Sequence, residues 1–302
     1  MARPLRIEFP GAVYHVTSRG NRKEQIFTGD ADRELFLHFV DQSMARLEAE
    51  AFAFCLMGNH YHFVVRTRQA NLSRLMRQIN GTYTQAYNKR HGLTGHIFQG
   101  RFHAVLVDRD AHLVEVCRYV ELNPVRACLV EAPADWRWSS HRAHVAIDPG
   151  YAWLATGALH GHLLGRDVRS AEDTRQAIHL WIVAVAQGLG VDPWMNNLRA
   201  EIFLGDEQFV ARMQALATRQ RLECDEIARV QRTDEHQLSR WLTPEHSKPE
   251  AYRRAYTEGG MTMAEIGRQA GLTASRVSRL ISTAEELCRQ DLTPTEARPD
   301  PS

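Results

Sequence analysis

Cysteine is scarce in this chain of 302 residues: there are five, and no two of them form a Cys-x-x-Cys motif. An odd number without close pairs argues against a disulfide framework and against a thiolate zinc site. No apolar run approaches the roughly 20 residues of a membrane span. The first ten residues lack the apolar centre of a signal peptide. These absences predict a reduced, cytoplasmic protein that does not associate with membranes.

Acidic residues are missing from one long stretch. Between Glu50 and Asp108 there is no Asp or Glu, although the whole chain is nearly balanced at a net charge of +1. Such a window, with seven fixed positive charges, predicts a surface that faces a polyanion. A general preference for Arg over Lys would explain the arginines but not the missing carboxylates. The cations of this acid-free window are Arg66, Arg68, Arg74, Arg77, Lys89, Arg90 and Arg101.

The apolar pattern predicts seven elements in the first half of the chain. Alternating, β-branched stretches predict strands at 12–18, 52–57, 61–66 and 102–107. Helical spacing predicts helices at 30–49, with Asp30 as N-cap, at 72–89, and from 110 to a stop at Pro124. The order β-α-β-β-α-β-α predicts an α+β fold, in which a small antiparallel sheet carries packed helices in a ferredoxin-like arrangement.

The stretch Gly58-Asn59-His60-Tyr61-His62 predicts a turn that leads into a strand. Side chains alternate along a strand, so His60 and His62 share a face and could bind one metal ion. Composition alone predicts about 0.7 His-x-His pairs by chance, and the chain has two. The second pair, His160 and His162, lies in a Gly-containing stretch without a strand pattern. Only the first pair is therefore predicted to bind a metal.

Tyr119 and Asn123 are four residues apart in the third predicted helix, so they share one face. Most helical tyrosines belong to the core or the surface, and that interpretation stays open here. The neighbouring amide, however, can give its oxygen to a metal or to an ordered water. Two imidazoles and one oxygen would leave coordination positions for phosphate oxygens.

Three motifs together resemble a known family. Gly58-Asn59-His60-Tyr61-His62, then Tyr119 with Asn123-Pro124-Val125-Arg126-Ala127, then Trp138-Ser139-Ser140 occur in the order and spacing of the REP-associated tyrosine transposases. These are relatives of the insertion-sequence-200-type transposases within the HUH nucleases. The resemblance covers roughly residues 5–145. It implies that His60 and His62 bind the metal and that Tyr119 is the nucleophile. Asn123 stands where related transposases have a Gln ligand, and it is one methylene shorter.

The resemblance implies cleavage of DNA by transesterification. Tyr119 would attack a phosphodiester, giving a 5′-phosphotyrosine and a free 3′-hydroxyl. The family implies Mg²⁺ or Mn²⁺ as cofactor and single-stranded DNA beside small hairpins as substrate. The acid-free window would hold the phosphates, with further contacts near the foot of the hairpin. An ordinary solvated basic face is the alternative for these further residues, which are Arg19, Arg22 and Lys23.

Residues 261–281 predict a helix, a glycine turn and a second helix, with Thr273 as a cap. This segment resembles the helix-turn-helix of replication-initiator proteins, which implies contact with duplex DNA. Ser275, Arg276 and Arg279 stand at the start of the second helix, where a recognition helix meets base edges. A three-helix bundle without a DNA role is the alternative.

The predicted domains are a transposase/nuclease domain at 1–145, a linker and helical region at 146–245, the helix-turn-helix at 246–290 and a disordered tail at 291–302. The oligomeric state stays open, with a monomer favoured. Two other functions compete with a strand transferase. One is a DNA-binding regulator whose nuclease site has decayed, and the other is a metal phosphodiesterase that uses water and leaves no covalent adduct.

Overall fold

The computed structural model describes residues 7–191, 198–199, 202–226, 237–259 and 261–290. The chain packs as two compact units, Met1–Ala217 and Thr218–Ser302. The tail predicted to be disordered, 291–302, lies outside the described residues. Within the described ranges, no helix combines the length and the apolar character needed to cross a membrane.

The first unit is built on a mixed sheet with the strand order β2-β3-β1-β4-β6-β5. β2 and β3 form the predicted hairpin around Gly58 and Asn59, and β1 pairs antiparallel with both β3 and β4. β6 joins β4 in parallel, which the sequence pattern did not predict. The strands are β1 Val13–Arg19, β2 Ala49–Leu56, β3 His60–Thr67, β4 His103–Val107, β5 Leu198–Arg199 and β6 Phe203–Leu204.

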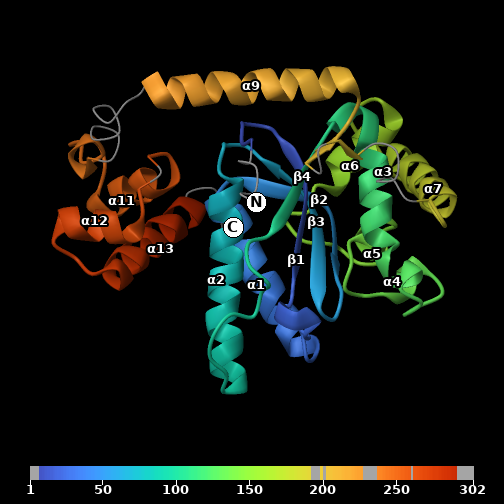
Figure 1. Cartoon of the computed structure of the whole chain (residues 1–302), viewed down its shortest axis with the longest axis horizontal. Helices are drawn as coiled ribbons and strands as arrows, with labels where there is room; N and C mark the ends of the chain where they lie inside the picture. The colour runs from blue at the N-terminus through green and yellow to red at the C-terminus, as the bar shows by residue number, and fades with distance from the viewer. Residues whose placement is uncertain (1–6, 192–197, 200–201, 227–236, 260, 291–302) are drawn as a thin grey trace, which may run out of the picture. The chain divides into compact units, whose positions relative to one another are not determined.

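Helices cover the two faces of this sheet (Figure 1). On one face, Tyr61 and Phe63 of β3 pack against Phe36, with ring centroids 5.0 and 6.3 Å apart. On the other face, Val64 lies in a buried cluster with Val116. The first face is covered by α1 Asp30–Arg46 and α2 Leu72–His91, and the second by α3 Arg109–Glu121, α6 Thr156–Leu164 and α7 Ala171–Gln187. The predicted α+β fold and its β-α-β-β-α-β-α order are confirmed.

Two predicted helix boundaries are wrong. The first helix ends at Arg46 and not at 49, because Glu48 takes a left-handed conformation with φ of 51° and β2 begins directly after it. Its N-cap is Gly29 and not Asp30. The third helix ends at Glu121, ahead of Pro124, which lies at the start of the short helix α4 Asn123–Arg126. Proline fits the first turn of a helix because its missing N–H is not needed there.

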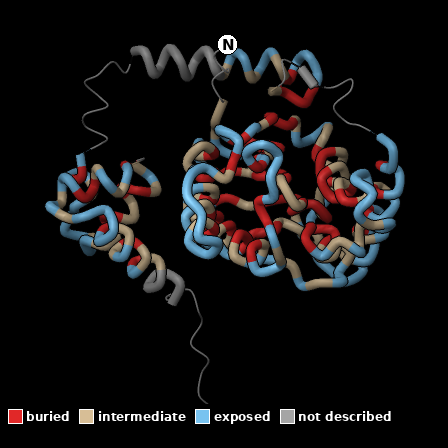
Figure 2. Tube along the Cα trace, turned by 60° about the horizontal axis from the view of Figure 1, so that its bottom comes forward, coloured by how far each residue is buried: buried red, intermediate tan, exposed pale blue. Residues whose placement is uncertain are grey.

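Packing of the first unit continues past residue 145, where the sequence analysis expects a linker to begin. Leu159 of α6 and Trp181 of α7 are fully buried in the same cluster as Val64. Figure 2 colours the chain by burial, and buried segments occur in both units. The backbone at 153–155 also bonds to β2, since the Ala51 amide donates to the Trp153 carbonyl and the Ala155 amide donates to the Ala51 carbonyl. The unit is completed by η1 Asn21–Lys23, η2 Pro133–Asp135, α5 His141–His144 and α9 Glu207–Glu226, whose last residues pass the boundary at 217.

The second unit contains the predicted pair of helices, α12 Met263–Ala270 and α13 Ala274–Gln290, after η3 Leu238–Arg240 and α11 Lys248–Thr257. Gly271 makes the turn with φ of 68°, a conformation that glycine adopts without strain. The Thr273 hydroxyl accepts the Arg276 amide at 3.3 Å, as a cap should. Ile266, Val277 and Ile281 are fully buried between the helices.

Candidate active site

Strand β3 presents His60 and His62 on the face that α3 covers. Their rings lie 4.9 Å apart, while Tyr61 between them points into the opposite layer. The pairing of β1 with β3 sets Thr17 opposite His62 and Arg19 opposite His60. The predicted common face of the two histidines is therefore confirmed as geometry.

A third histidine, His15 of β1, completes a cluster with the pair. Its Nε2 lies 3.0 Å from Nδ1 of His62, and the two rings are stacked with centroids 5.3 Å apart. Burial lowers the pKa of His15 to about 3, with a further contribution from His103. Burial, followed by the charge of Arg19, lowers the pKa of His60 to about 4. Burial beside its two His neighbours also holds the pKa of His62 well below the usual range. All three imidazoles are neutral at pH 7.

Neutral imidazoles with one nitrogen already engaged are suited to bind a metal. Nδ1 of His60 donates to Oδ1 of Asn59 at 2.7 Å, and Nδ1 of His62 faces His15. In each ring Nε2 is the nitrogen left for a ligand. Among the described residues, no three His, Cys, Asp or Glu side chains converge to hold a metal. A metal on His60 and His62 would take its other ligands from an amide oxygen, water or DNA phosphate.

Tyr119 of α3 lies against this histidine cluster. Its ring meets His15 and His62 edge to face, with centroids 6.1 and 6.2 Å away. The Arg126 guanidinium covers the same ring at 4.9 Å from its centroid, a cation–π contact that restrains it. Residues that are about 60 positions apart in sequence are thus brought together, as the predicted roles of His62 and Tyr119 require.

The side chain of Asn123 does not bond to the histidine cluster in the way that the predicted ligand role would suggest. Its side-chain amide donates to the carbonyls of Tyr119 and Val120 at 2.9 and 3.3 Å, so that it bonds to the end of α3 rather than to the histidines. This contact turns the NH₂ group to the helix and leaves Oδ1 as the atom that could bind a metal or a water. Its role as a ligand stays a prediction.

His15 is the member of the histidine cluster that the sequence analysis missed. It belonged to a stretch correctly predicted as a strand, but a strand pattern does not say which strand lies beside it. The available signal was the position of His15 in the alternating pattern of its own strand. If that strand pairs antiparallel with the strand of His60 and His62, the side chain of His15 lies on the same face of the sheet as theirs.

Replacing His15 by Phe should therefore weaken binding of Mn²⁺ by 10- to 100-fold, the range for loss of an outer-shell partner. The reason is that His62 would lose the acceptor that directs its Nδ1 proton away from the metal. His15→Gln, which keeps an acceptor, should recover part of the affinity, and His38→Ala on α1 should change nothing. Titration calorimetry with Mn²⁺ measures this, and equal affinity in wild type and the Phe variant would contradict it.

The predicted DNA-binding cations differ in their surroundings. Arg66 is paired with Glu50, the acidic residue just outside the acid-free window, and lies over Phe52. Arg90 is 3.4 Å from Asp32, and Arg74 is partly buried. These three positive charges are balanced or shielded by the protein. The remaining ones are exposed, and they are Arg19, Arg22, Lys23, Arg68, Arg77, Lys89 and Arg101.

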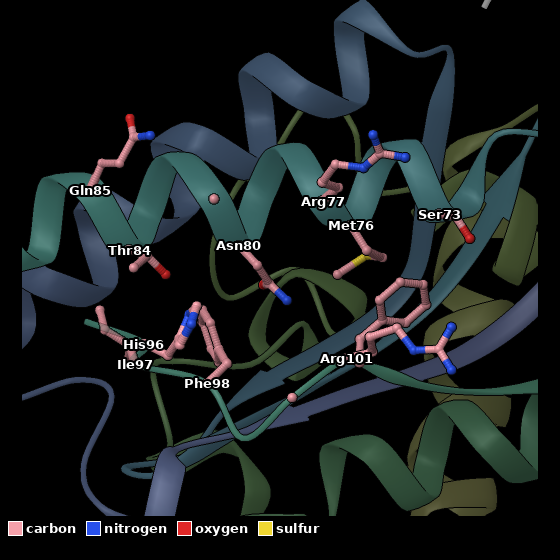
Figure 3. A pocket seen from close by; sticks show the side chains of 13 residues that line it. Ser73, Met76, Arg77, Asn80, Thr84, Gln85, His96, Ile97, Phe98 and Arg101 are labelled. Carbon is pink, nitrogen blue, oxygen red and sulfur yellow. The ribbon is translucent and has the colours of Figure 1, made fainter. Parts of the chain in front are cut away.

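Two of these exposed arginines, Arg77 and Arg101, line a groove of about 590 Å³ between α2 and residues 96–102. Figure 3 shows Met76, Asn80 and Thr84 of α2 pointing across it toward the other wall. That wall is attached to the end of β1, because the Asn21 amide donates to the Ile97 carbonyl and the Gln99 amide to the Arg19 carbonyl. Arg19 is opposite His60 in the sheet. The groove therefore borders the end of the sheet that carries the histidines.

In the second unit, the residues predicted to contact duplex DNA are exposed. Ser275, Arg276 and Arg279 lie on the outer side of α13, while Val277 between them is buried. This agrees with the predicted orientation of the helix; the contact with DNA itself stays a prediction.

Residues 9–123 match the family model described as "Transposase IS200 like". The matched segment is similar to the IS200-like transposases. It contains the whole histidine cluster, Tyr119 and Asn123, and the match ends at the last of them. The chain thus carries a DNA transposase/nuclease domain, as the three motifs predicted.

One solved structure that is similar to this chain is titled as the REP-associated tyrosine transposase bound to a REP hairpin. The sequences are 21% identical, and the alignment covers 48% of this chain and 86% of that one, with a TM-score of 0.43. No curated protein matches this chain.

Proposed function

We propose that this protein is a metal-dependent single-stranded DNA endonuclease and strand transferase that works through a 5′-phosphotyrosine on Tyr119. The observation that carries the proposal is the meeting of Tyr119 with His62 and His15 across α3 and the sheet. The Tyr119 ring thus lies against a histidine cluster in which His60 and His62 have Nδ1 engaged and Nε2 left for a ligand, and this arrangement supports the proposed chemistry.

The proposed reaction exchanges one phosphate ester for another. The Tyr119 oxygen attacks the phosphorus, the bond from phosphorus to the 3′ oxygen breaks, and the 3′ end leaves as a hydroxyl. The phenol proton is lost during the attack, because a free tyrosine has a pKa near 10. Attack by another 3′-hydroxyl on the phosphotyrosine reverses these steps and joins new ends, so that no water is consumed.

The cofactor of the proposal is Mg²⁺ or Mn²⁺. His60 and His62 would hold it through Nε2, with Oδ1 of Asn123 as the third protein donor. When bound, such a cation polarises the scissile phosphate and stabilises the charge of the transition state. The residues of the chain prepare this site: Asn59 and His15 orient the two rings, and Arg126 restrains the nucleophile.

The proposed substrate is single-stranded DNA beside a hairpin. The protein in the similar solved structure is bound to a REP hairpin. In this chain, the support comes from the exposed cations at the end of β1 and around the groove, namely Arg19, Arg22, Lys23, Arg77 and Arg101. A groove with arginines and the ring of Phe98 suits unpaired nucleotides, since bases stack on aromatic and guanidinium faces. Arg68 and Lys89 would contact phosphates farther along.

The second unit is proposed to bind duplex DNA through Ser275, Arg276 and Arg279. A chain ending at Glu226, after α9, should therefore cleave a short hairpin oligonucleotide with a single-turnover rate within about twofold of the full chain at saturation, because the proposed site precedes it. A folded but inactive truncated chain would assign part of the active site to the second unit.

In the full chain, Arg276→Ala with Arg279→Ala should weaken binding of duplex DNA by about 5- to 150-fold, since a bidentate base contact is worth about 1–3 kcal/mol. The matched control is Arg268→Ala, an exposed arginine on α12. Fluorescence anisotropy at a fixed salt concentration gives both affinities. Equal losses in the two variants would indicate a general effect of charge rather than a recognition helix.

A further inference from the structure

A buried ionic cluster lies behind the nucleophile, at the C-terminal end of α3. Glu121 has no exposed surface. Its Oε1 accepts Nδ1 of His144 and the Ser140 hydroxyl, each at 2.6 Å, and its Oε2 accepts Nδ1 of His141 at 2.8 Å and the Trp181 indole N–H at 3.1 Å. Four donors around two oxygens satisfy this carboxylate.

The carboxylate of this cluster is held by directed hydrogen bonds from outside α3, which come from residues 140–144 and from Trp181 of α7. Removing one partner from such a buried, satisfied charge is costly, whereas an apolar side chain of similar volume could fill the space without directional contacts. The cluster therefore fixes geometry in a way that apolar packing does not.

The hydrogen bonds of the cluster connect the nucleophile helix to β2, the strand that pairs with β3. Ser140 donates to Glu121, accepts the amide of Phe54 at 3.1 Å and donates its own amide to the Phe54 carbonyl at 3.0 Å. Phe54 belongs to β2, where its neighbour Cys55 pairs with His62 of β3. A short path of hydrogen bonds thus runs from the residue two after Tyr119 to the strand that carries His62.

The two residues Tyr119 and Glu121 point to opposite sides of α3. Positions two apart on a helix differ by about 200°. Tyr119 faces His15 and His62, while Glu121 faces α5 and α7. The Glu121 carboxylate is held on one side of α3 by donors from α5 and α7. These bonds thereby fix the rotation of α3, which presents the Tyr119 ring on its other side.

We propose that Glu121 is a positioning residue for the Tyr119 nucleophile, acting through His141, His144 and Ser140 to hold the end of α3 against β2. The expected effect of this positioning on the DNA cleavage rate rests on the proposed function, because the position of the Tyr119 hydroxyl determines that rate only if Tyr119 is the nucleophile. The anchoring itself concerns the free protein and does not depend on DNA.

The variant that tests this is Glu121→Gln, which keeps the size of the side chain but turns an NH₂ group toward N–H or O–H donors. The single-turnover cleavage rate at saturating hairpin should fall about 100-fold, the cost of a displacement on the order of 1 Å. The affinity for the hairpin should stay within about twofold, because no DNA-binding residue is altered. Ser140→Ala, which cuts the link to β2 but leaves Glu121 three donors, should show a smaller fall of the same kind.

General destabilisation is separated from positioning by Val40→Ala, a buried change on α1 at the opposite face of the sheet. All rates are compared at temperatures where each variant is folded. A wild-type rate in Glu121→Gln, or a fall no larger than in Val40→Ala, would overturn the proposal. If Glu121→Gln does not fold, Ser140→Ala decides in its place.

A second measurement does not need cleavage. With ¹³C-labelled tyrosine, the Tyr119 ring resonances are shifted by the nearby rings of His15 and His62. They should move or split in Glu121→Gln and stay unchanged in Val40→Ala. Unchanged Tyr119 signals in Glu121→Gln and Ser140→Ala would overturn the anchoring even if the wild-type protein cleaves DNA. Shifted Tyr119 signals in Glu121→Gln, together with a wild-type protein that forms no adduct, would uphold the anchoring and reject the proposed function.

Discussion

Tyr119→Phe should lower DNA cleavage to below about 1% of the wild-type rate and abolish the covalent protein–DNA adduct, because only the nucleophilic oxygen is lost. The ring, its edge contacts with His15 and His62 and its cation–π contact with Arg126 all remain. Binding of the hairpin should therefore stay nearly intact. Single-turnover cleavage of an end-labelled hairpin, run on a denaturing gel, measures both product and adduct.

Tyr87→Phe is the matched control for this change. Tyr87 lies on α2, on the other side of the sheet, where its ring packs against Tyr83. It should cleave at the wild-type rate. Cleavage by Tyr119→Phe above a few per cent would reject the nucleophile and direct attention to Tyr61, Tyr83 and Tyr87.

His60→Ala and His62→Ala should each abolish metal-dependent cleavage and reduce the affinity for Mn²⁺ by at least about 100-fold, since each removes one of two imidazole ligands. Both variants should still bind the hairpin. Rates measured across a range of Mn²⁺ concentrations separate a weakened metal site from a lost chemical step: a partial loss would be recovered at high metal, and a misfolded variant would not.

The control for the histidine variants is His162→Ala. His160 and His162 lie on the helix α6, where positions two apart point about 200° away from each other and cannot share a ligand. His160 is also buried and bonds to the His144 carbonyl at 3.0 Å, so its replacement would disturb the fold. His162→Ala should cleave normally. A loss equal to that of His60→Ala would remove the reason for choosing the first pair.

The first half of the fold could be predicted because its signals are local. The alternation in β3 indicated a shared face for His60 and His62, and helical spacing indicated the helix that carries Tyr119, although α3 ends before Asn123. Hydrophobic periodicity reports which side of an element is buried, and each of these inferences needed nothing more.

What the sequence could not predict depends on pairing between distant segments. His15 joins the site only through the register of β1 with β3. Arg66 meets Glu50 because β2 begins at Ala49, ahead of the strand predicted at 52–57, so that the predicted hairpin extends to this pair. The segment from about 145 to 172 carries few regular patterns, and its burial follows from the contacts of Trp153 and Leu159 with the first half of the chain. The buried contacts of Glu121 could not be predicted for the same reason, because all four of its hydrogen-bond donors lie outside α3.

The central claim is that Tyr119 becomes covalently joined to a 5′-phosphate of DNA, and one measurement tests it most directly. The wild-type protein is incubated with a single-stranded hairpin oligonucleotide and Mn²⁺, the adduct is isolated under denaturing conditions, and its nuclease- and protease-treated peptides are analysed by mass spectrometry. The account predicts one modified peptide, which carries a nucleotide on Tyr119 through its 5′-phosphate, together with a released fragment that ends in a 3′-hydroxyl. Cleaved DNA without any adduct would indicate a phosphodiesterase that uses water, hairpin binding without cleavage would indicate a regulator, and a nucleotide on another residue would contradict the assignment of Tyr119.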